Sequence, residues 1–255
     1  MPRLRLCAVA VAAALLAMPG LVGAADDSAS PPHERWSFDG PWGTYDRASV
    51  QRGFQIYTQV CSACHPVKHL HFRDLAQIGY SEDEVKAFAA AVQVTDGPND
   101  QGKMYQRPGR PSDPFPDPFP NDQAARAANN GALPPDQSLI IKARDEGPDY
   151  VYALLTGYTP APAGFQLPAG MYYNKYFPGH QIAMPPPLAA NSLSFADGTP
   201  ATLPQMAHDA VTFLTWASEP ELETRHRAGF AVFFFLIVTA SVFYAVKRKI
   251  WSRLH

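Results

Sequence analysis

Hydrophobic residues recur at helical spacing in four stretches of the chain. Val50, Phe54 and Tyr57 stand at i, i+4 and i+7, which predicts an amphipathic helix that leads into residue 61. Ser81-Glu82-Asp83-Glu84 is a capping box that opens a second helix. The second helix has Val85, Phe88 and Val92 on its apolar face. A third helix is predicted from Tyr150, Val151, Leu154 and Leu155. A fourth is predicted from Met206, Ala210, Phe213, Leu214 and Ala217. No stretch alternates steadily between apolar and polar residues, so we predict an all-α fold.

Two glycines add to this pattern. Gly53 lies within the first helix, where the missing side chain allows another element to approach closely. Gly157 follows the third helix, over residues 149–156, and predicts its C-terminal end.

The N-terminal residues form a targeting pattern. Arg3 and Arg5 precede an apolar run, and small residues occupy positions 22–24. This order predicts a secretory signal peptide over residues 1–24, cleaved before Ala25. A transmembrane anchor is the alternative, but the run is short for a span and ends in small residues.

A second apolar segment lies near the C-terminus. Residues 228–246 carry no charge and are about as long as a bilayer core is thick. A buried helix is the alternative, yet residues 233–238 are apolar on every side. Basic residues in 247–255 mark the cytoplasmic side, although 225–227 are also basic. We therefore predict a single-pass protein of the inner membrane, with a periplasmic domain over 25–227, a transmembrane helix and a cytoplasmic tail.

Composition narrows the function classes. The formal net charge is −2, and no basic cluster is interleaved with aromatic residues, so nothing suggests nucleic acid as a partner. The chain has 26 prolines, which concentrate in residues 106–120, 158–168 and 185–187. Such density predicts long extended loops between the helices.

The chemistry is indicated by Cys61-Ser62-Ala63-Cys64-His65. Two thiols three residues apart, followed by an imidazole, form the attachment motif of c-type haem, in which the histidine is the proximal ligand of the iron. A zinc site would need further ligands at suitable spacing, and the only other cysteine, Cys7, lies in the predicted signal peptide. A disulfide between Cys61 and Cys64 would leave His65 unexplained.

The haem iron needs a sixth ligand, for which the residues leave several candidates. Met184 precedes Pro185-Pro186-Pro187, which stiffens its loop, and a thioether favours ferrous iron. His180 is the second choice. The other candidates are His33, His69, His71, His208, Met104, Met171 and Met206, of which Met206 fits the apolar face of a helix better.

Several segments together resemble cytochrome c1, the haem subunit of the cytochrome bc1 complex, in its bacterial form. Besides the haem motif, the resemblance rests on the segments 94–100, 126–136, 149–158, 177–179, 183–188 and 216–221 and on the basic end of the apolar helix, 247–249.

The resemblance implies a class I cytochrome c-like domain with one covalent haem c. Cys61 and Cys64 would form the thioethers, His65 and Met184 would be the axial ligands, and Arg126 would reach a haem propionate. It also implies that a carbonyl of Pro134-Pro135 accepts the second N–H of the proximal imidazole. Some bacterial relatives carry an extra cysteine pair that staples the distal loop. Here the expected mature chain has only Cys61 and Cys64, so that loop must be held by packing and proline stiffness.

The implied function is a one-electron relay within ubiquinol–cytochrome c reductase, with no bond-making in this subunit. The implied partners are cytochrome b, a Rieske iron–sulfur protein, an acceptor cytochrome c and membrane lipid, in a dimeric multi-subunit complex. Acidic candidates for docking the acceptor are Asp113, Asp117, Asp122 and Asp145-Glu146. The alternatives are an anchored cytochrome of a terminal oxidase or nitric-oxide reductase, and a haem enzyme or gas sensor with an open sixth position.

Overall fold

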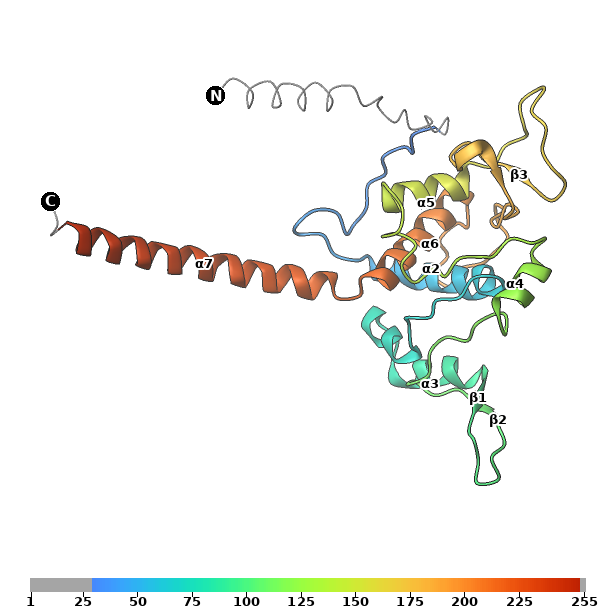
Figure 1. Cartoon of the computed structure of the whole chain (residues 1–255), viewed down its shortest axis with the longest axis horizontal. Helices are drawn as coiled ribbons and strands as arrows, with labels where there is room; N and C mark the ends of the chain where they lie inside the picture. Colours follow the sequence, from blue (N-terminus) through green and yellow to red (C-terminus); the bar gives the residue numbers. More distant parts are fainter. Residues whose placement is uncertain (1–28, 253–255) are drawn as a thin grey trace, which may run out of the picture.

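A computed structural model describes residues 29–252 of the chain (Figure 1). The predicted signal peptide and the last three residues of the predicted tail lie outside this range. Helices dominate the described residues, and the strands are few and short, which confirms the predicted mostly helical fold. The main elements are α2 (Arg47–Gln59), α3 (Glu82–Ala90), β1 (Gln93–Asp96), β2 (Tyr105–Pro108), α4 (Asp122–Ala128), α5 (Gly147–Thr156), β3 (Tyr172–Tyr173), β4 (Gln181–Ile182), α6 (Leu203–Ser218) and α7 (Leu222–Trp251). Three 3-10 helices join them: η1 (Cys61–Ala63), η2 (Phe72–Ile78) and η3 (Pro178–His180).

Helices α2 and α6 pack along each other at the centre of the domain, and α5 packs on α6 (Figure 1). Gly53 of α2 lies at this contact. A Cβ built on Gly53 would stand 2.6 Å from the Cβ of Phe213 and still closer to the backbone oxygen of Asp209. The close approach expected at Gly53 is therefore made by another helix of the same chain.

Replacing Gly53 with alanine should lower the free energy of unfolding, by about 1–3 kcal/mol, because the added methyl group forces α2 and α6 apart. The better helix propensity of alanine offsets this by only about 1 kcal/mol. Thermal unfolding followed by circular dichroism would measure the effect. Gly229→Ala in α7 is the matched control, because a Cβ there meets no atom within 4 Å. Equal melting temperatures for the two variants would contradict the close-packing argument.

The domain has two hydrophobic clusters that share α2. The larger one is rich in aromatic rings; Phe54 packs against Phe115 and Phe213 at centroid distances of 6.0 and 5.8 Å. The smaller one is built on Ile56 and the fully buried Met206, as expected for a core methionine. Its other buried members are Leu188, Phe195, Ala201, Ala207 and Ala210.

A buried charge network ties α2 to α6. Arg52 donates to both carboxylate oxygens of Asp209, at 2.7 and 2.9 Å, and to Asp197 at 2.7 Å. Asp209 is fully buried. Burial by itself would raise the pKa of Asp209, but hydrogen bonds from His208 and Arg52 outweigh it and lower that pKa. The pair therefore stays charged and fixes how the two helices face each other.

The predicted helices lie where the pattern placed them, with small differences at their ends; α5, for example, begins at Gly147 instead of residue 149. Ser81 caps α3 and forms the expected capping box with Glu84. Helix α3 ends at Ala90, so Val92 lies beyond it, although it still packs against the larger cluster. Gly157 ends α5 as predicted, but its φ of −87° is not the left-handed conformation common for a glycine after a helix.

Two antiparallel ladders were not expected from the sequence. In the first, Gln93 pairs with Pro108 and Asp96 with Tyr105. In the second, Tyr172 pairs with Ile182. Strands of two to four residues are too short to produce a visible alternation, which explains why the pattern did not reveal them.

Helix α7 leaves the domain as a long single helix (Figure 1). Only Glu219-Pro220-Glu221 separates it from the end of α6. Among the described residues it is the one helix long and apolar enough to cross a membrane; an 18-residue stretch of it has a mean hydropathy of 2.3. Its large apolar side chains from Val232 to Trp251 are exposed. The predicted span over 228–246 is the middle of this longer helix.

Candidate haem site

The two thiols and the imidazole of the haem motif lie within one helical turn. Helix α2 ends at Gln59, and the chain tightens into η1. The carbonyl oxygen of Cys61 accepts hydrogen bonds from the N–H groups of Cys64, at 3.1 Å, and His65, at 2.9 Å. Both cysteines are free thiols. This turn presents Cys61, Cys64 and His65 together, as the motif predicted.

Cys61 is held between the two hydrophobic clusters and packs against both. Burial, and secondarily the neighbouring Cys64, raise the pKa of the Cys61 thiol to about 12. The thiol is therefore uncharged at neutral pH and lies in an apolar setting that suits a flat hydrophobic macrocycle.

His65 is fixed in one tautomer. Its Nδ1 lies 2.8 Å from the carbonyl oxygen of Pro135, which confirms the contact expected for that loop. A carbonyl can only accept, so Nδ1 carries the hydrogen and Nε2 keeps a free lone pair. Burial lowers the pKa of His65 in spite of this hydrogen bond, which keeps the imidazole neutral. A neutral imidazole with a free Nε2 is the form that binds a metal.

Two further contacts hold the loops around His65. The Tyr57 hydroxyl donates to the carbonyl oxygen of His65 at 3.1 Å. The N–H of Gln137 donates to Pro66 at 2.8 Å, which ties the loop of Pro135 to the haem motif. Burial raises the pKa of Tyr57, so its hydroxyl stays protonated as a donor. The sequence placed Tyr57 on the buried face of the helix but did not indicate this contact.

Met184 stands just after β4 in a half-buried loop. Its carbonyl oxygen accepts a hydrogen bond from the Tyr158 hydroxyl at 3.0 Å, and Leu188 anchors the far end of the loop in the smaller cluster. The buried Asn174 donates to Leu154 of α5 at 2.8 Å and to the carbonyl oxygen of His180 at 3.1 Å. The loop is therefore held by packing and hydrogen bonds, as its lack of an extra cysteine pair requires.

Three of the histidines that competed with Met184 have other partners. The ring of His180 stacks on that of Tyr173 with centroids 5.3 Å apart, and its Nδ1 lies 3.2 Å from the backbone carbonyl oxygen of Asn174. His208 stacks on Trp36 at 4.8 Å, and His33 pairs with Asp149 at 2.8 Å. Each of these contacts gives the side chain a structural role.

Arg126 lies in the last turn of α4 and is exposed. Its guanidinium donates to the carbonyl oxygen of Gly131 at 3.1 Å. The neighbouring Ala125 lines a cleft of about 340 Å³ together with Cys64, Leu133 and Pro134, whereas Arg126 is not among its lining residues. The structure thus puts α4 beside the haem motif but does not place the guanidinium in the cleft.

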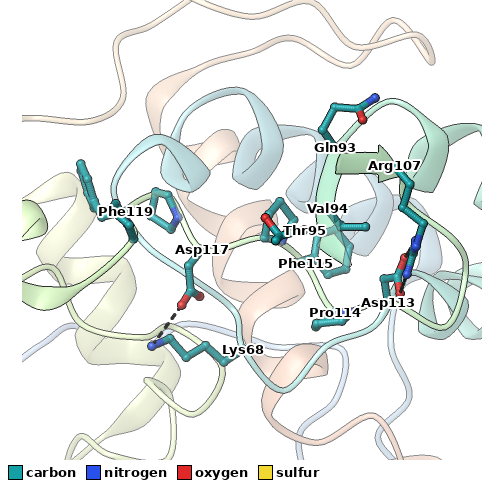
Figure 2. Close-up of a pocket in the computed structure, with 13 residues that line it drawn as sticks. Lys68, Gln93, Val94, Thr95, Arg107, Asp113, Pro114, Phe115, Asp117 and Phe119 are labelled. Atoms are coloured by element: carbon teal, nitrogen blue, oxygen red, sulfur yellow. Dashed lines mark hydrogen bonds and ion pairs between the residues drawn. The ribbon is translucent and has the colours of Figure 1, made fainter. Parts of the chain in front are cut away.

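A larger cleft of about 720 Å³ shares part of its lining with the first, and Figure 2 shows the side chains that line it. It contains none of the five predicted site residues and shares the Lys68–Asp117 ion pair, at 3.3 Å, with the smaller cleft. At its edge Arg107 donates to both oxygens of Asp113, at 2.6 and 2.9 Å. These bonds lower the pKa of Asp113 to about 2. Asp113 and Asp117 therefore already have cationic partners within the chain.

The donor set fits a haem better than a free metal ion. In the described part of the chain no group of three or more His, Cys, Asp or Glu side chains is arranged to hold a metal. The motif instead offers two unpaired thiols in an apolar setting and one imidazole nitrogen with a free lone pair. This combination suits a macrocycle that brings its own iron and is linked through sulfur.

Comparison with known proteins gives a consistent result. The Cytochrome C1 family matches residues 36–254. A "Cytochrome c1" of Rhodospirillum rubrum is 44% identical over 96% of this chain and 96% of its own length. A mitochondrial "Cytochrome c1 1, heme protein" of Arabidopsis thaliana is 50% identical over 88% of this chain and 73% of its own. A "Cytochrome b/c1" of Bradyrhizobium diazoefficiens is 48% identical over 90% of this chain, which spans 37% of that longer relative.

Proposed function

The chain belongs to the cytochrome c1 family, and on that premise we propose that it relays single electrons in the quinol-oxidising bc1 complex of a respiratory chain. The electrons would come from a Rieske iron–sulfur protein and pass to a cytochrome c. The observation that carries this proposal is His65, whose Nδ1–H is bonded to Pro135 and whose Nε2 is free, within one turn of two unpaired thiols.

Each site residue has a distinct task in this proposal. Cys61 and Cys64 would hold the haem covalently as thioethers. His65, oriented by Pro135 and Tyr57, and Met184, held by Tyr158, would be the protein ligands of its iron. When bound in this way, haem c supplies a reversible one-electron couple. If His65 and Met184 are both ligands, no position would remain for a substrate, so this subunit would itself make no bonds.

The proposed location follows from α7. This helix crosses the inner membrane once, with the haem domain in the periplasm and residues 247–255 in the cytoplasm, after removal of a signal peptide over 1–24. The basic side chains of Lys247, Arg248 and Lys249 support this orientation. In the complex the chain contacts the cytochrome b subunit and the Rieske protein, within a dimer.

The acceptor cytochrome c would be guided by acidic side chains that lack an internal partner. Asp113 and Asp117 are engaged by Arg107 and Lys68. Of the acidic residues considered, Asp122 and Asp145-Glu146 remain the better candidates for electrostatic steering.

Arg126 should tune the haem rather than attach it. Replacing Arg126 with alanine removes a positive charge near the propionates, which favours the ferric state and lowers the midpoint potential by on the order of tens of millivolts. Redox titration of the purified protein would measure this, with covalent haem unchanged. Arg126→Lys should show a smaller shift because it keeps the charge without the planar fork.

Arg144→Ala is the matched control for Arg126→Ala. Arg144 is also exposed and also donates to a backbone carbonyl, that of Ala143. Equal midpoint potentials in the Arg126→Ala and Arg144→Ala variants would show that Arg126 does not interact with a haem propionate.

The proposed function is tested by isolating the complex. The haem c chain should co-purify with a b-type cytochrome that oxidises quinol, and its haem should be reduced when quinol is added. Carbon monoxide should leave the reduced spectrum unchanged, because Met184 occupies the sixth position. Co-purification with a terminal oxidase or nitric-oxide reductase would support that alternative, and a strong carbon monoxide response would indicate a haem enzyme or sensor.

A further inference from the structure

An aromatic side chain stands exposed where the haem domain meets helix α7. The side chain of Trp42 is 75% exposed, although it belongs to a segment whose neighbours Phe38 and Tyr45 are buried. Its ring stacks on Phe230 of α7, with centroids 3.9 Å apart and planes 10° from parallel. A large exposed tryptophan needs an explanation, because burying its ring would remove a large apolar area from water.

The segment of Trp42 is fixed to the start of α7. The N–H of Tyr45 donates to Glu223 at 2.9 Å, and the guanidinium of Arg47 pairs with the same carboxylate at 2.9 Å. The ring of His226 lies 3.3 Å from the carbonyl oxygen of Gly43. Gly43 is itself buried against the backbone of Phe38, so the turn has little freedom to move. Trp42 is therefore held at one level along α7.

That level is the start of the apolar part of the helix. Residues 225–227 are Arg-His-Arg, and the uncharged run begins at Ala228. Phe230, the residue under the Trp42 ring, lies less than one turn inside this run. A tryptophan at the boundary between basic and apolar residues occupies the position in which tryptophans concentrate at membrane interfaces.

The opposite end of α7 also carries an exposed tryptophan. Trp251 is exposed there, and the ammonium of Lys247 lies 5.1 Å from its ring. The uncharged run, residues 228–246, rises about 27 Å at 1.5 Å per residue. The hydrocarbon core of a bilayer is about 30 Å thick. Trp42 and Trp251 thus stand near the two ends of a run about as long as one bilayer core is thick.

We infer that Trp42 inserts into the headgroup and glycerol region of the outer leaflet, as a second membrane contact of the haem domain beside α7. The partner is the lipid surface itself, since the indole offers an apolar ring to the acyl chains and an N–H to the headgroups. Trp42 lies in an exposed turn together with Asp39, Gly40 and Pro41. This inference rests on the proposed crossing of the membrane by α7.

The test is a depth measurement on the full-length chain with its haem, reconstituted in lipid nanodiscs. Trp42→Cys is labelled with a nitroxide, and electron paramagnetic resonance compares collisions with oxygen, which enters lipid, and with a nickel chelate, which stays in water. Because thioether formation consumes the thiols of Cys61 and Cys64, the introduced cysteine is the reactive one in the mature chain. Asp83→Cys, whose native side chain is 94% exposed in α3, is the aqueous control, and Phe234→Cys is the control for the hydrocarbon core.

The label at position 42 should collide with the nickel chelate about threefold less often than the label at position 83, as interfacial positions are shielded from water. A second label at Pro41→Cys leaves Trp42 in place and should show the same shielding, which covers the case in which Trp42→Cys disturbs the turn. Labels at 41 and 42 that are as accessible to nickel as the label at 83 would overturn the inference.

Two other outcomes are distinguishable. Shielding from both oxygen and nickel at position 42 would mean that protein covers the turn, which also overturns a lipid contact. A label at Phe234→Cys that fails to collide with oxygen would instead refute the crossing of the membrane by α7. The haem absorption spectrum of every variant shows whether the domain is intact.

Discussion

Replacing Met184 with leucine should leave the covalent haem in place but remove the ability of the protein to accept electrons from its donor. Leucine is close to methionine in volume, so the loop held by Tyr158 and Leu188 should pack almost as before. The sulfur is lost, however, and with it the preference for ferrous iron. The midpoint potential should fall by a sizeable part of the roughly 0.8 V range that axial ligands span. Quinol-driven reduction of cytochrome c should then collapse.

Three measurements separate this result from a general loss of structure. The haem content per chain stays normal, the far-red charge-transfer band of ferric Met-ligated haem disappears, and carbon monoxide now changes the reduced spectrum. Met104→Leu is the control, because Met104 is exposed on the hairpin of β1 and β2. Survival of both the band and the turnover in Met184→Leu would place the distal ligand elsewhere, and His180→Gln would be examined next.

Loss of either thiol should have the other large effect. Cys61→Ala and Cys64→Ala each remove one of the two sulfurs that η1 presents, so normal attachment of haem c fails and the amount of holoprotein drops to near background. Haem staining after denaturing electrophoresis measures covalent haem. The pyridine haemochrome spectrum shows whether any remaining haem has one unsaturated vinyl group.

The control for the cysteine variants lies between them. Ser62 donates to the carbonyl oxygen of Thr58 at 2.8 Å and takes no part in the proposed attachment. Ser62→Ala should therefore keep normal haem content. A Cys61→Ala variant with the band position and staining of the parent protein would rule out the haem motif as the attachment site.

Local signals in the sequence were sufficient to predict α2, α3, α5 and α6 and to recognise the haem motif. The spacing of Val50, Phe54 and Tyr57 predicted α2, and the capping box at Ser81 predicted the start of α3, because both depend on residues within one or two turns. The haem motif is equally local. The contact from His65 to Pro135 joins residues far apart in the chain, and it was expected only through the resemblance to a known family.

What the sequence could not show depends on distant partners. Helix α4 is only seven residues long and has one buried residue, Ala125, so it leaves no periodic pattern. Gly157 was expected as a helix stop, yet its φ of −87° needs no glycine. Glycine is required there because a Cβ would lie 2.5 Å from the ring of Tyr176, a clash that only the folded chain reveals. The hydrogen bond from the Tyr158 hydroxyl to Met184 also joins residues far apart in the chain, so the sequence does not reveal it.

The short junction between α6 and α7 limits how electrons can reach this domain. Only three residues join the two helices, and Tyr45 and Arg47 bond to Glu223 just beyond them. A junction of this kind cannot act as a long flexible linker, so in the proposed complex the folded chain would set the height of the haem above the bilayer. The rate of electron tunnelling falls steeply with distance, and a haem fixed in this way cannot move closer to its electron donor or acceptor. In the proposed complex, the movements that carry electrons to and from this haem would therefore have to be made by the partner proteins, while this domain stays in place.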